Sequence, residues 1–223
     1  MLHGQGADEG GRERLNTVAA ECARAGARVE TSLGDLAKEG VAAELVRAAR
    51  ASLGPVDAIV HAAGFADRRG FQKLPREGLE RAFAVMAASF HELAAATLTD
   101  LARPQGRVVA ISSFGVHRFT PDSTYPASSA AKAALEALTK SLAIELAPSG
   151  ATANIIVPGF TRKDAGLTGA LDAQAWKAAA RANPMARLAE PDEIAALAAF
   201  LLSPEAGHIT GALLPIDGGL TLM

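Results

Sequence analysis

The chain has 223 residues, of which 49% are hydrophobic, and its 22 basic and 24 acidic residues leave a formal net charge of −2. This length suits a single domain over residues 1–223, and the balanced charge argues against a nucleic-acid or membrane partner. Because Cys22 is the only cysteine, an intrachain disulfide and a multi-cysteine metal site are excluded, and we expect no metal. We also expect no apolar run long enough to span a bilayer. Without a signal-peptide pattern at the start, a cytoplasmic location follows.

Helical and strand-like patterns alternate along the chain. Helical periodicity covers residues 13–25, 41–52, 77–103, 127–147, 172–181 and 192–202. Short apolar runs typical of strands cover residues 28–31, 56–61, 107–111, 152–157 and 212–216. This alternation predicts an α/β fold with one doubly wound parallel sheet and helices on both faces. Ligands bind at the carboxyl ends of the strands in such sheets.

Three chemically useful groups follow the strand at 107–111. Ser112 and Ser113 end that strand, Tyr125 comes twelve residues after the second serine, and Lys132 lies seven residues further on an alanine-rich helix. An ammonium lowers the pKa of a nearby phenol, which can then exchange a proton with a substrate oxygen. Successive residues of a strand face opposite ways, so only one of the two serines can hold that oxygen.

Several short motifs occur in a specific order along nearly the whole chain. They are Gly34-Asp35-Leu36, His61-Ala62-Ala63-Gly64, Ile111-Ser112-Ser113, Lys132-Ala133-Ala134-Leu135 and the run from Asn154 to Phe160. Together they resemble the classical short-chain dehydrogenases/reductases, and residues 187–222 resemble the ending of 3-oxoacyl-carrier-protein reductase-like members. The resemblance implies a Rossmann-like three-layer α/β/α fold. It also implies NAD or NADP as cofactor, a small carbonyl or alcohol substrate, and a homodimer or homotetramer built through the helices at 77–103 and 127–147.

The same resemblance implies a role for each matching residue. Ser113 would hold the substrate oxygen, and Lys132 would bind the nicotinamide ribose and lower the pKa of the tyrosine. Asp35 would accept a hydrogen bond from the adenine amine. The remaining cofactor-binding positions, at the adenine end, beside the adenosine ribose and beside the nicotinamide, would be Leu36, Ala62, Ala63, Gly64, Pro158, Gly159 and Thr161.

The front of the chain departs from the family. Members begin with a strand, a glycine-rich turn and a helix that hold the pyrophosphate, whereas residues 1–4 resemble the end of the family's second strand. No strand precedes the glycines that follow, so we do not read them as the phosphate loop. The absent unit would be the central strand, and without it the neighbouring strand edges are exposed. Either the start is misassigned or truncated, or the protein folds without this unit and has lost ordinary dinucleotide binding.

The tyrosine is also displaced. In the family it lies four residues before the lysine, a position that Ser128 occupies here. Tyr125 is about 10 Å from Lys132 along an ideal helix, and residues 125, 128, 129 and 132 would share one helix face. Pro126 suits a first helical turn, which would put Tyr125 at the mouth of the helix. Tyr125 is then either the phenol supplied from one turn upstream or a loop aromatic.

Two further positions differ from the family pattern. Met86 stands where a helix asparagine orders a relay water, and a thioether cannot replace an amide there. His61 replaces the first asparagine of the strand-end motif, and we interpret it as a structural, hydrogen-bonded residue. The leading function is an NAD(P)-dependent oxidoreductase that transfers hydride between nicotinamide and a ketone or secondary alcohol, with Ser113, Tyr125 and Lys132 as catalytic residues. The alternative is a catalytically silent relative that serves as a binding or structural subunit.

Overall fold

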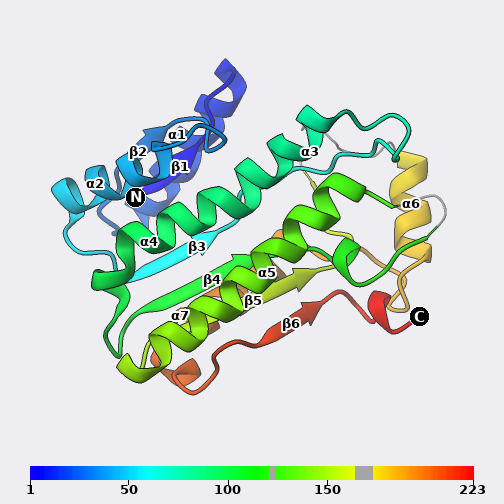
Figure 1. The fold of residues 1–223 in the computed structure, drawn as a ribbon. Coiled ribbons are helices and arrows are strands. Elements are labelled where there is room, and N and C mark those ends of the chain that lie inside the picture. The colour runs from blue at the N-terminus through cyan, green and yellow to red at the C-terminus, as the bar shows by residue number, and fades with distance from the viewer. Residues whose placement is uncertain (121–123, 164–172) are drawn as a thin grey trace.

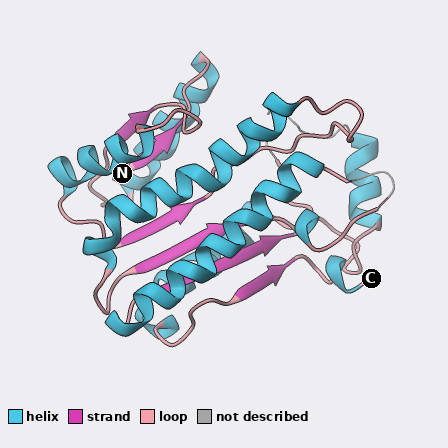
Figure 2. Ribbon diagram, viewed as in Figure 1, coloured by secondary structure: helices cyan, strands magenta, loops and turns pink. Residues whose placement is uncertain are grey.

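The strands form two parallel sheets, shown in magenta in Figure 2, in a computed structural model that describes residues 1–120, 124–163 and 173–223. The smaller sheet pairs β1 (Leu2–Gly4) with β2 (Thr31–Leu33). The larger sheet has the order β3-β4-β5-β6. Its strands are β3 (Ala58–His61), β4 (Arg107–Ile111), β5 (Thr152–Pro158) and β6 (Leu213–Ile216).

Helices connect and cover these strands (Figure 1). The α-helices are α1 (Glu9–Arg24), α2 (Val41–Leu53), α3 (Arg76–Phe83), α4 (Ser89–Leu101), α5 (Pro126–Leu146), α6 (Ala173–Arg181) and α7 (Pro191–Leu202). A π-helical turn, η1 (Ala84–Ala88), joins α3 to α4, and short 3₁₀ turns are η2 (Phe114–Val116), η3 (Ala147–Ser149), η4 (Pro204–Ala206) and η5 (Leu220–Leu222). Figure 1 shows α4 and α5 in front of the larger sheet and α7 behind it.

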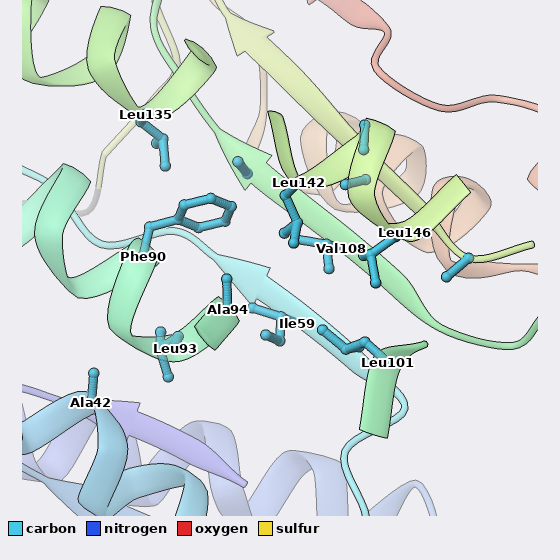
Figure 3. Packing of buried hydrophobic residues seen from close by; sticks show 14 of the residues in the cluster. Ala42, Ile59, Phe90, Leu93, Ala94, Leu101, Val108, Leu135, Leu142 and Leu146 are labelled. Carbon is cyan, nitrogen blue, oxygen red and sulfur yellow. The ribbon is translucent and has the colours of Figure 1, made fainter. Parts of the chain in front are cut away.

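Alternating residues of β4 divide the core between the two faces. Val108 lies in a buried cluster with Phe90 of α4 and Leu135 of α5, which gather over the strands in Figure 3. Val109, the next residue, lies in a second cluster with Leu201 of α7. Because strand side chains alternate between faces, this division is the three-layer α/β/α arrangement, and the expected fold class is confirmed.

The structure corrects three details of the predicted elements. The second strand covers 31–33 rather than 28–31, because Leu2 N donates to Glu30 O (2.8 Å) and places the pairing with β1 from Thr31 onward. The helix predicted at 77–103 covers 76–101 and contains the π-helical turn. The sheet is in two pieces instead of one, since neither β1 nor β2 pairs with a strand of the larger sheet in the part of the chain that the structure describes.

The helical run 76–101 also corrects the expectation about membrane-spanning segments. By length and composition alone it is long and apolar enough to cross a membrane. In the structure, however, Met86, Phe90 and Leu101 from this run are fully buried against other elements. An apolar helix that packs its face into a sheet is typical of the core of a globular domain.

Candidate active site

Lys132 bridges the carboxyl ends of the neighbouring strands β3 and β4. Its Nζ donates hydrogen bonds to Ala63 O (3.0 Å), just after β3, and to Ile111 O (2.6 Å), the last residue of β4. The in-register pairing of β3 with β4 brings these two carbonyls to one edge of the sheet. The expected convergence of Lys132 with the strand-end motifs is therefore present in the structure.

The electrostatics of Lys132 suit a proton-transfer site. The side chain is buried, and burial lowers its pKa from 10.5 to about 8, while the charge of Glu136 opposes this shift. Gly64 leaves room for it, since a Cβ at that position would lie 3.1 Å from Lys132 Nζ. A buried ammonium of this kind acts strongly on a neighbouring phenol because the local dielectric is low.

The two serines after β4 face opposite ways, as the strand geometry predicts. Ser112 Oγ donates to the buried carboxylate of Glu136, which also pairs with His117 Nε2 at 3.0 Å. Ser113 Oγ accepts a hydrogen bond from Gly115 N (3.2 Å) and caps η2. This bond uses a lone pair of Ser113 and leaves its hydroxyl proton for a substrate oxygen. Ser112 has a structural partner, so Ser113 is the better candidate.

Tyr125 lies immediately before α5 rather than within it. Its backbone is left-handed (φ 41°, ψ 51°), and the helix begins at Pro126. Tyr125 O accepts a hydrogen bond from Ser129 N (2.9 Å), so Tyr125 lies at the mouth of the helix, as Pro126 indicates, and only its left-handed backbone was not predicted. Its hydroxyl forms no hydrogen bond to any residue that the structure describes. Left-handed non-glycine residues concentrate at functional sites, and a role for Tyr125 stays a prediction.

Ser128, at the usual tyrosine position, is a structural clamp. Its Oγ donates to Phe65 O (3.0 Å) and accepts from Asp67 N (2.8 Å). Asp67 in turn binds the Arg69 guanidinium, which holds the pKa of this carboxyl below its usual value. Ser128 thus ties the start of α5 to the loop that follows β3.

His61 has a defined tautomer and no partner on one nitrogen. Ser89 Oγ donates its only proton to Val85 O (2.6 Å), so His61 Nε2, 3.0 Å from that oxygen, must be the donor. His61 Nδ1 is then an unprotonated, buried acceptor without a partner in the described structure. Burial lowers the pKa of His61 to about 3, and the charge of Lys132 adds to this effect. The imidazole is neutral at physiological pH, which agrees with a structural role.

Met86 lies in the π-helical turn behind the strand-end motif. It is fully buried among alanines of α3 and α5, and its sulfur would lie 3.6 Å from a Cβ at Gly64. Single π-helical turns inside α-helices occur frequently at functional sites. Met86 therefore forms an apolar wall on this side of the site, where the family pattern has an amide.

A cavity of about 780 Å³ adjoins the strand-end motif and lies between β1 and β3. Its lining includes the expected adenosine-side residues Asp35, Leu36, Ala62, Ala63 and Gly64. The Arg81 guanidinium lies 2.8 Å from Asp35 Oδ2, and this hydrogen bond holds the pKa of the carboxyl below its usual value.

Ala63 and Gly64 present backbone rather than bulky side chains to the cavity. The size and the lining suit the adenosine part of a dinucleotide.

The nicotinamide-side residues follow β5. Pro158 ends this strand, and Gly159 packs so tightly that a Cβ there would lie 2.8 Å from Asp217 Cα. Thr161 Oγ1 donates to Gly159 O (3.2 Å) and shapes the turn. Phe160 contacts Phe114, with ring centroids 4.5 Å apart, so an aromatic pair lies between this turn and Ser113.

The residues at the start of the chain suit the pyrophosphate of a dinucleotide less well than the rest of the site suits its two ends. Asp8 caps α1 and accepts from Gly11 N (2.6 Å), so a carboxylate already occupies the end of the helix that would attract a phosphate. The expectation that no strand precedes the first glycines is wrong, because β1 (Leu2–Gly4) comes directly before them. The carboxylate of Asp8 at the helix end still argues against a phosphate loop. The residues present fit the adenosine and nicotinamide ends of a dinucleotide, and no described turn cradles its pyrophosphate.

A three-layer parallel fold with a cavity at its strand ends is typical of nucleotide-binding domains, and a buried lysine with an adjacent serine suits carbonyl/alcohol chemistry. The family model described as "Enoyl-(Acyl carrier protein) reductase" matches residues 5–221. The chain belongs to the short-chain dehydrogenase/reductase family, whose members are NAD(P)-dependent and act on CH–OH or C=O groups.

Named relatives and solved structures agree with this class. The chain is 36% identical over 180 residues to acetoacetyl-CoA reductase of Allochromatium vinosum, covering 80% of this chain and 71% of that one. It is 33% identical over 181 residues to 3-oxoacyl-[acyl-carrier-protein] reductase FabG of Vibrio cholerae, covering 80% and 72%. A short-chain dehydrogenase/reductase structure from Serratia marcescens superposes with a TM-score of 0.84 at 30% identity, covering 94% and 83%.

Sequence reasoning missed three contacts of this site. They are the Ser112–Glu136–His117 cluster, the Arg81–Asp35 ion pair and the Phe114–Phe160 contact. Glu136 lies four residues after Lys132, one helical turn away, so the spacing could have indicated it. The other two join segments far apart in the chain and carry no local signal.

Proposed function

We propose that this chain transfers hydride between a nicotinamide cofactor and the carbonyl carbon of a small ketone or 3-oxoacyl substrate, through Ser113, Tyr125 and Lys132. The observation that carries the proposal is the buried Lys132 ammonium across the ends of β3 and β4. The names of two relatives, a reductase of acetoacetyl-CoA and one of 3-oxoacyl groups, support the substrate class.

The residues divide the work as follows. Ser113 donates its hydroxyl proton to the substrate oxygen and fixes its position. The phenol of Tyr125 gives the proton that converts this oxygen into a hydroxyl, and takes it back in the oxidative direction. Lys132 would bind the ribose of the nicotinamide. A bound nicotinamide supplies or accepts the hydride.

The cofactor would be held by the residues that line the two fitting ends of the site. On the adenosine side these are Asp35, Leu36, Ala62, Ala63 and Gly64, and beside the nicotinamide they are Lys132, Pro158, Gly159 and Thr161. The choice between NAD and NADP stays open, because Gln5 near the end of β1 is neutral and selects neither a ribose hydroxyl pair nor a phosphate.

We also propose a cytoplasmic homodimer or homotetramer. The long helices α4 and α5 would form its interface, as the family resemblance implies. Ile144 of α5, which is 77% exposed, would lie in that interface.

A second candidate is a catalytically silent relative that acts as a binding or structural subunit. Ser128 at the usual tyrosine position is committed to the Phe65 and Asp67 backbone. The sheet is in two pieces at the point where the family's phosphate-binding unit belongs. Both observations favour lost or weakened cofactor binding.

Fluorescence titration of the chain with NADH and with NADPH separates the two candidates. Saturable micromolar binding, followed by nucleotide oxidation when acetoacetyl-CoA is added, supports the oxidoreductase. A folded chain that binds neither nucleotide supports the silent subunit. Ser113→Ala should retain nucleotide binding and lose turnover, because its hydroxyl proton is assigned to the substrate oxygen and its other contact is the local cap of η2.

A further inference from the structure

Glu136 is a buried carboxylate that the proposed reaction does not use. It lies on α5 one helical turn after Lys132, so the two side chains share a face of the helix. Its side chain is only 8% exposed, and a carboxylate in such a place is costly unless hydrogen bonds satisfy it. Ser112 Oγ donates to Glu136 Oε1, and His117 Nε2 lies 3.0 Å from the same oxygen. Both partners belong to the segment that follows β4.

This carboxylate joins the segment 113–118 to α5. The backbone N–H of Ser112 is still paired with β5, and after it the chain leaves the sheet. The backbone hydrogen bonds of the segment are then internal, and Gly115 N donates to Ser113 Oγ (3.2 Å). Within the described residues, the bond between His117 and the carboxylate is the one hydrogen bond that joins this segment to another element. The place of the segment on α5 therefore depends on that bond.

An aromatic contact adds to this bond without replacing it. The ring centroids of Phe114 and Phe160 lie 4.5 Å apart. Contact between apolar rings has little directional preference, whereas a hydrogen bond loses strength steeply when its angle changes. The Glu136 carboxylate holds Ser112 on one side of Ser113 and His117 on the other. It thus limits how far Ser113 can move along α5 or away from it.

We propose that Glu136 is a positioning residue, which acts through Ser112 and His117 to fix the Ser113 hydroxyl relative to Lys132. This role rests on the oxidoreductase function proposed above, in which Ser113 holds the substrate oxygen. Because Glu136 and Lys132 belong to one helix, a segment tied to Glu136 keeps its distance from the ammonium. The charge of Glu136 also favours the ammonium form of Lys132, whose pKa it raises against the effect of burial.

Two variants of similar size separate the hydrogen bonds from the packing. Glu136→Gln keeps an oxygen that accepts from both partners, whereas Glu136→Met keeps the volume but offers only a weak acceptor. In the absence of nucleotide and substrate, the Gly115 amide should exchange at least about fivefold faster in Glu136→Met than in Glu136→Gln, because its acceptor Ser113 Oγ is no longer held. Thr139→Val is the control, since it removes a buried hydroxyl bonded to its own helix. It should leave the exchange of Gly115 unchanged.

Steady-state kinetics measures the consequence for turnover. Glu136→Met should lose about 10–100-fold in kcat, the usual effect of a small misplacement of a reacting group. Glu136→Gln should recover most of this loss, and the KM for the nucleotide should stay within about twofold in both variants, because uniform binding is unaltered. A merely structural role would instead lower the activity of both variants in proportion to their lost stability.

His117 supplies an independent variant at a partly exposed position. His117→Leu removes the far contact of the carboxylate, and His117→Gln keeps a donor there. His117→Leu should lower kcat about fivefold, but in the Glu136→Met background it should add less than about twofold, because both changes remove the same bond. Should Glu136→Met fail to fold, the Gly115 exchange of His117→Leu against that of His117→Gln supplies the same comparison.

The outcomes separate this role from the proposed function. Equal Gly115 exchange in Glu136→Met and Glu136→Gln overturns the positioning role, and so does full additivity of the Glu136 and His117 changes in kcat. An unaltered chain that turns over no ketone with either nucleotide overturns the oxidoreductase function. The Gly115 exchange, which needs neither nucleotide nor substrate, then still shows whether Glu136 holds Ser113 in place.

Discussion

Gly64 and Lys132 are in such close contact that any side chain at position 64 would force Lys132 to shift. A Cβ at Gly64 would lie 3.1 Å from both Cε and Nζ of Lys132. The ammonium is held in place by two backbone carbonyls, so it cannot move away without losing a hydrogen bond. The absence of a side chain at position 64 is therefore a requirement of the lysine site as much as of a bound ribose.

Gly64→Ala should disturb this site without unfolding the chain. We expect the variant to lose at least about fivefold in turnover, because a displacement of Lys132 by a fraction of an ångström breaks a hydrogen bond worth about 1 kcal/mol or more. Gly70→Ala is the matched control, since a Cβ at Gly70 meets nothing within 4 Å. Steady-state kinetics of the two variants checks the prediction, which fails if both retain the activity of the unaltered chain.

The burial of His61 predicts acid sensitivity. The pKa of His61 is lowered to about 3 in the folded chain. The unfolded chain therefore binds a proton near pH 6.5, whereas the folded chain does not. The free energy of unfolding should fall as the pH drops below 6.5, by about 2 kcal/mol between pH 7 and pH 5. His61→Asn should lose this dependence, and the same change at the exposed His208 should keep it. Urea unfolding at several pH values measures both.

The lowered pKa of Lys132 predicts that the stability of the folded chain changes with pH in the alkaline range. Its pKa is lowered from 10.5 to about 8 by burial, so the folded chain loses this proton before the unfolded chain does. The cost of the buried charge is fully present below pH 8, and stability should rise by up to about 3 kcal/mol between pH 8 and pH 10.5.

Lys132→Met removes the titrating group. Its stability relative to the unaltered chain should therefore decline over the same interval. Lys140→Met, at an exposed position of α5, is the matched control. Thermal unfolding from pH 7 to pH 10 distinguishes the two, and parallel curves for both variants would contradict the assignment.

The two hydrogen bonds of Ser128 predict a loss of stability when its hydroxyl is removed. Ser128→Ala leaves Phe65 O and Asp67 N without their partner, which should lower the free energy of unfolding by about 1–3 kcal/mol. Ser52→Ala, which removes an exposed hydroxyl bonded to its own helix, should change stability by less than about 0.5 kcal/mol. Chemical denaturation measures both, and equal effects would show that Ser128 is no clamp.

How much of this molecule could be predicted depends on the range of the interactions involved. The apolar run at 107–111 and the alternation of elements indicate the three-layer fold because periodicity is a local signal. The strand-end motifs likewise predict that Lys132 meets the ends of β3 and β4, since parallel strands bring their carboxyl ends together. The left-handed turn at Tyr125 was missed because Pro126 indicates where the helix starts but not how the preceding residue turns. The Asp35–Arg81 ion pair was missed because it joins residues 46 positions apart.

The central claim is that Tyr125 supplies the reacting proton, and turnover of Tyr125→Phe tests it most directly. With NADH or NADPH and acetoacetyl-CoA, the variant should lose about 10²–10⁴-fold in kcat, the usual contribution of a positioned acid or base, while its nucleotide binding is unchanged. A Tyr125→Phe variant that turns over within a few-fold of the unaltered chain would contradict the claim, because no other tyrosine exists in the sequence to supply a phenol.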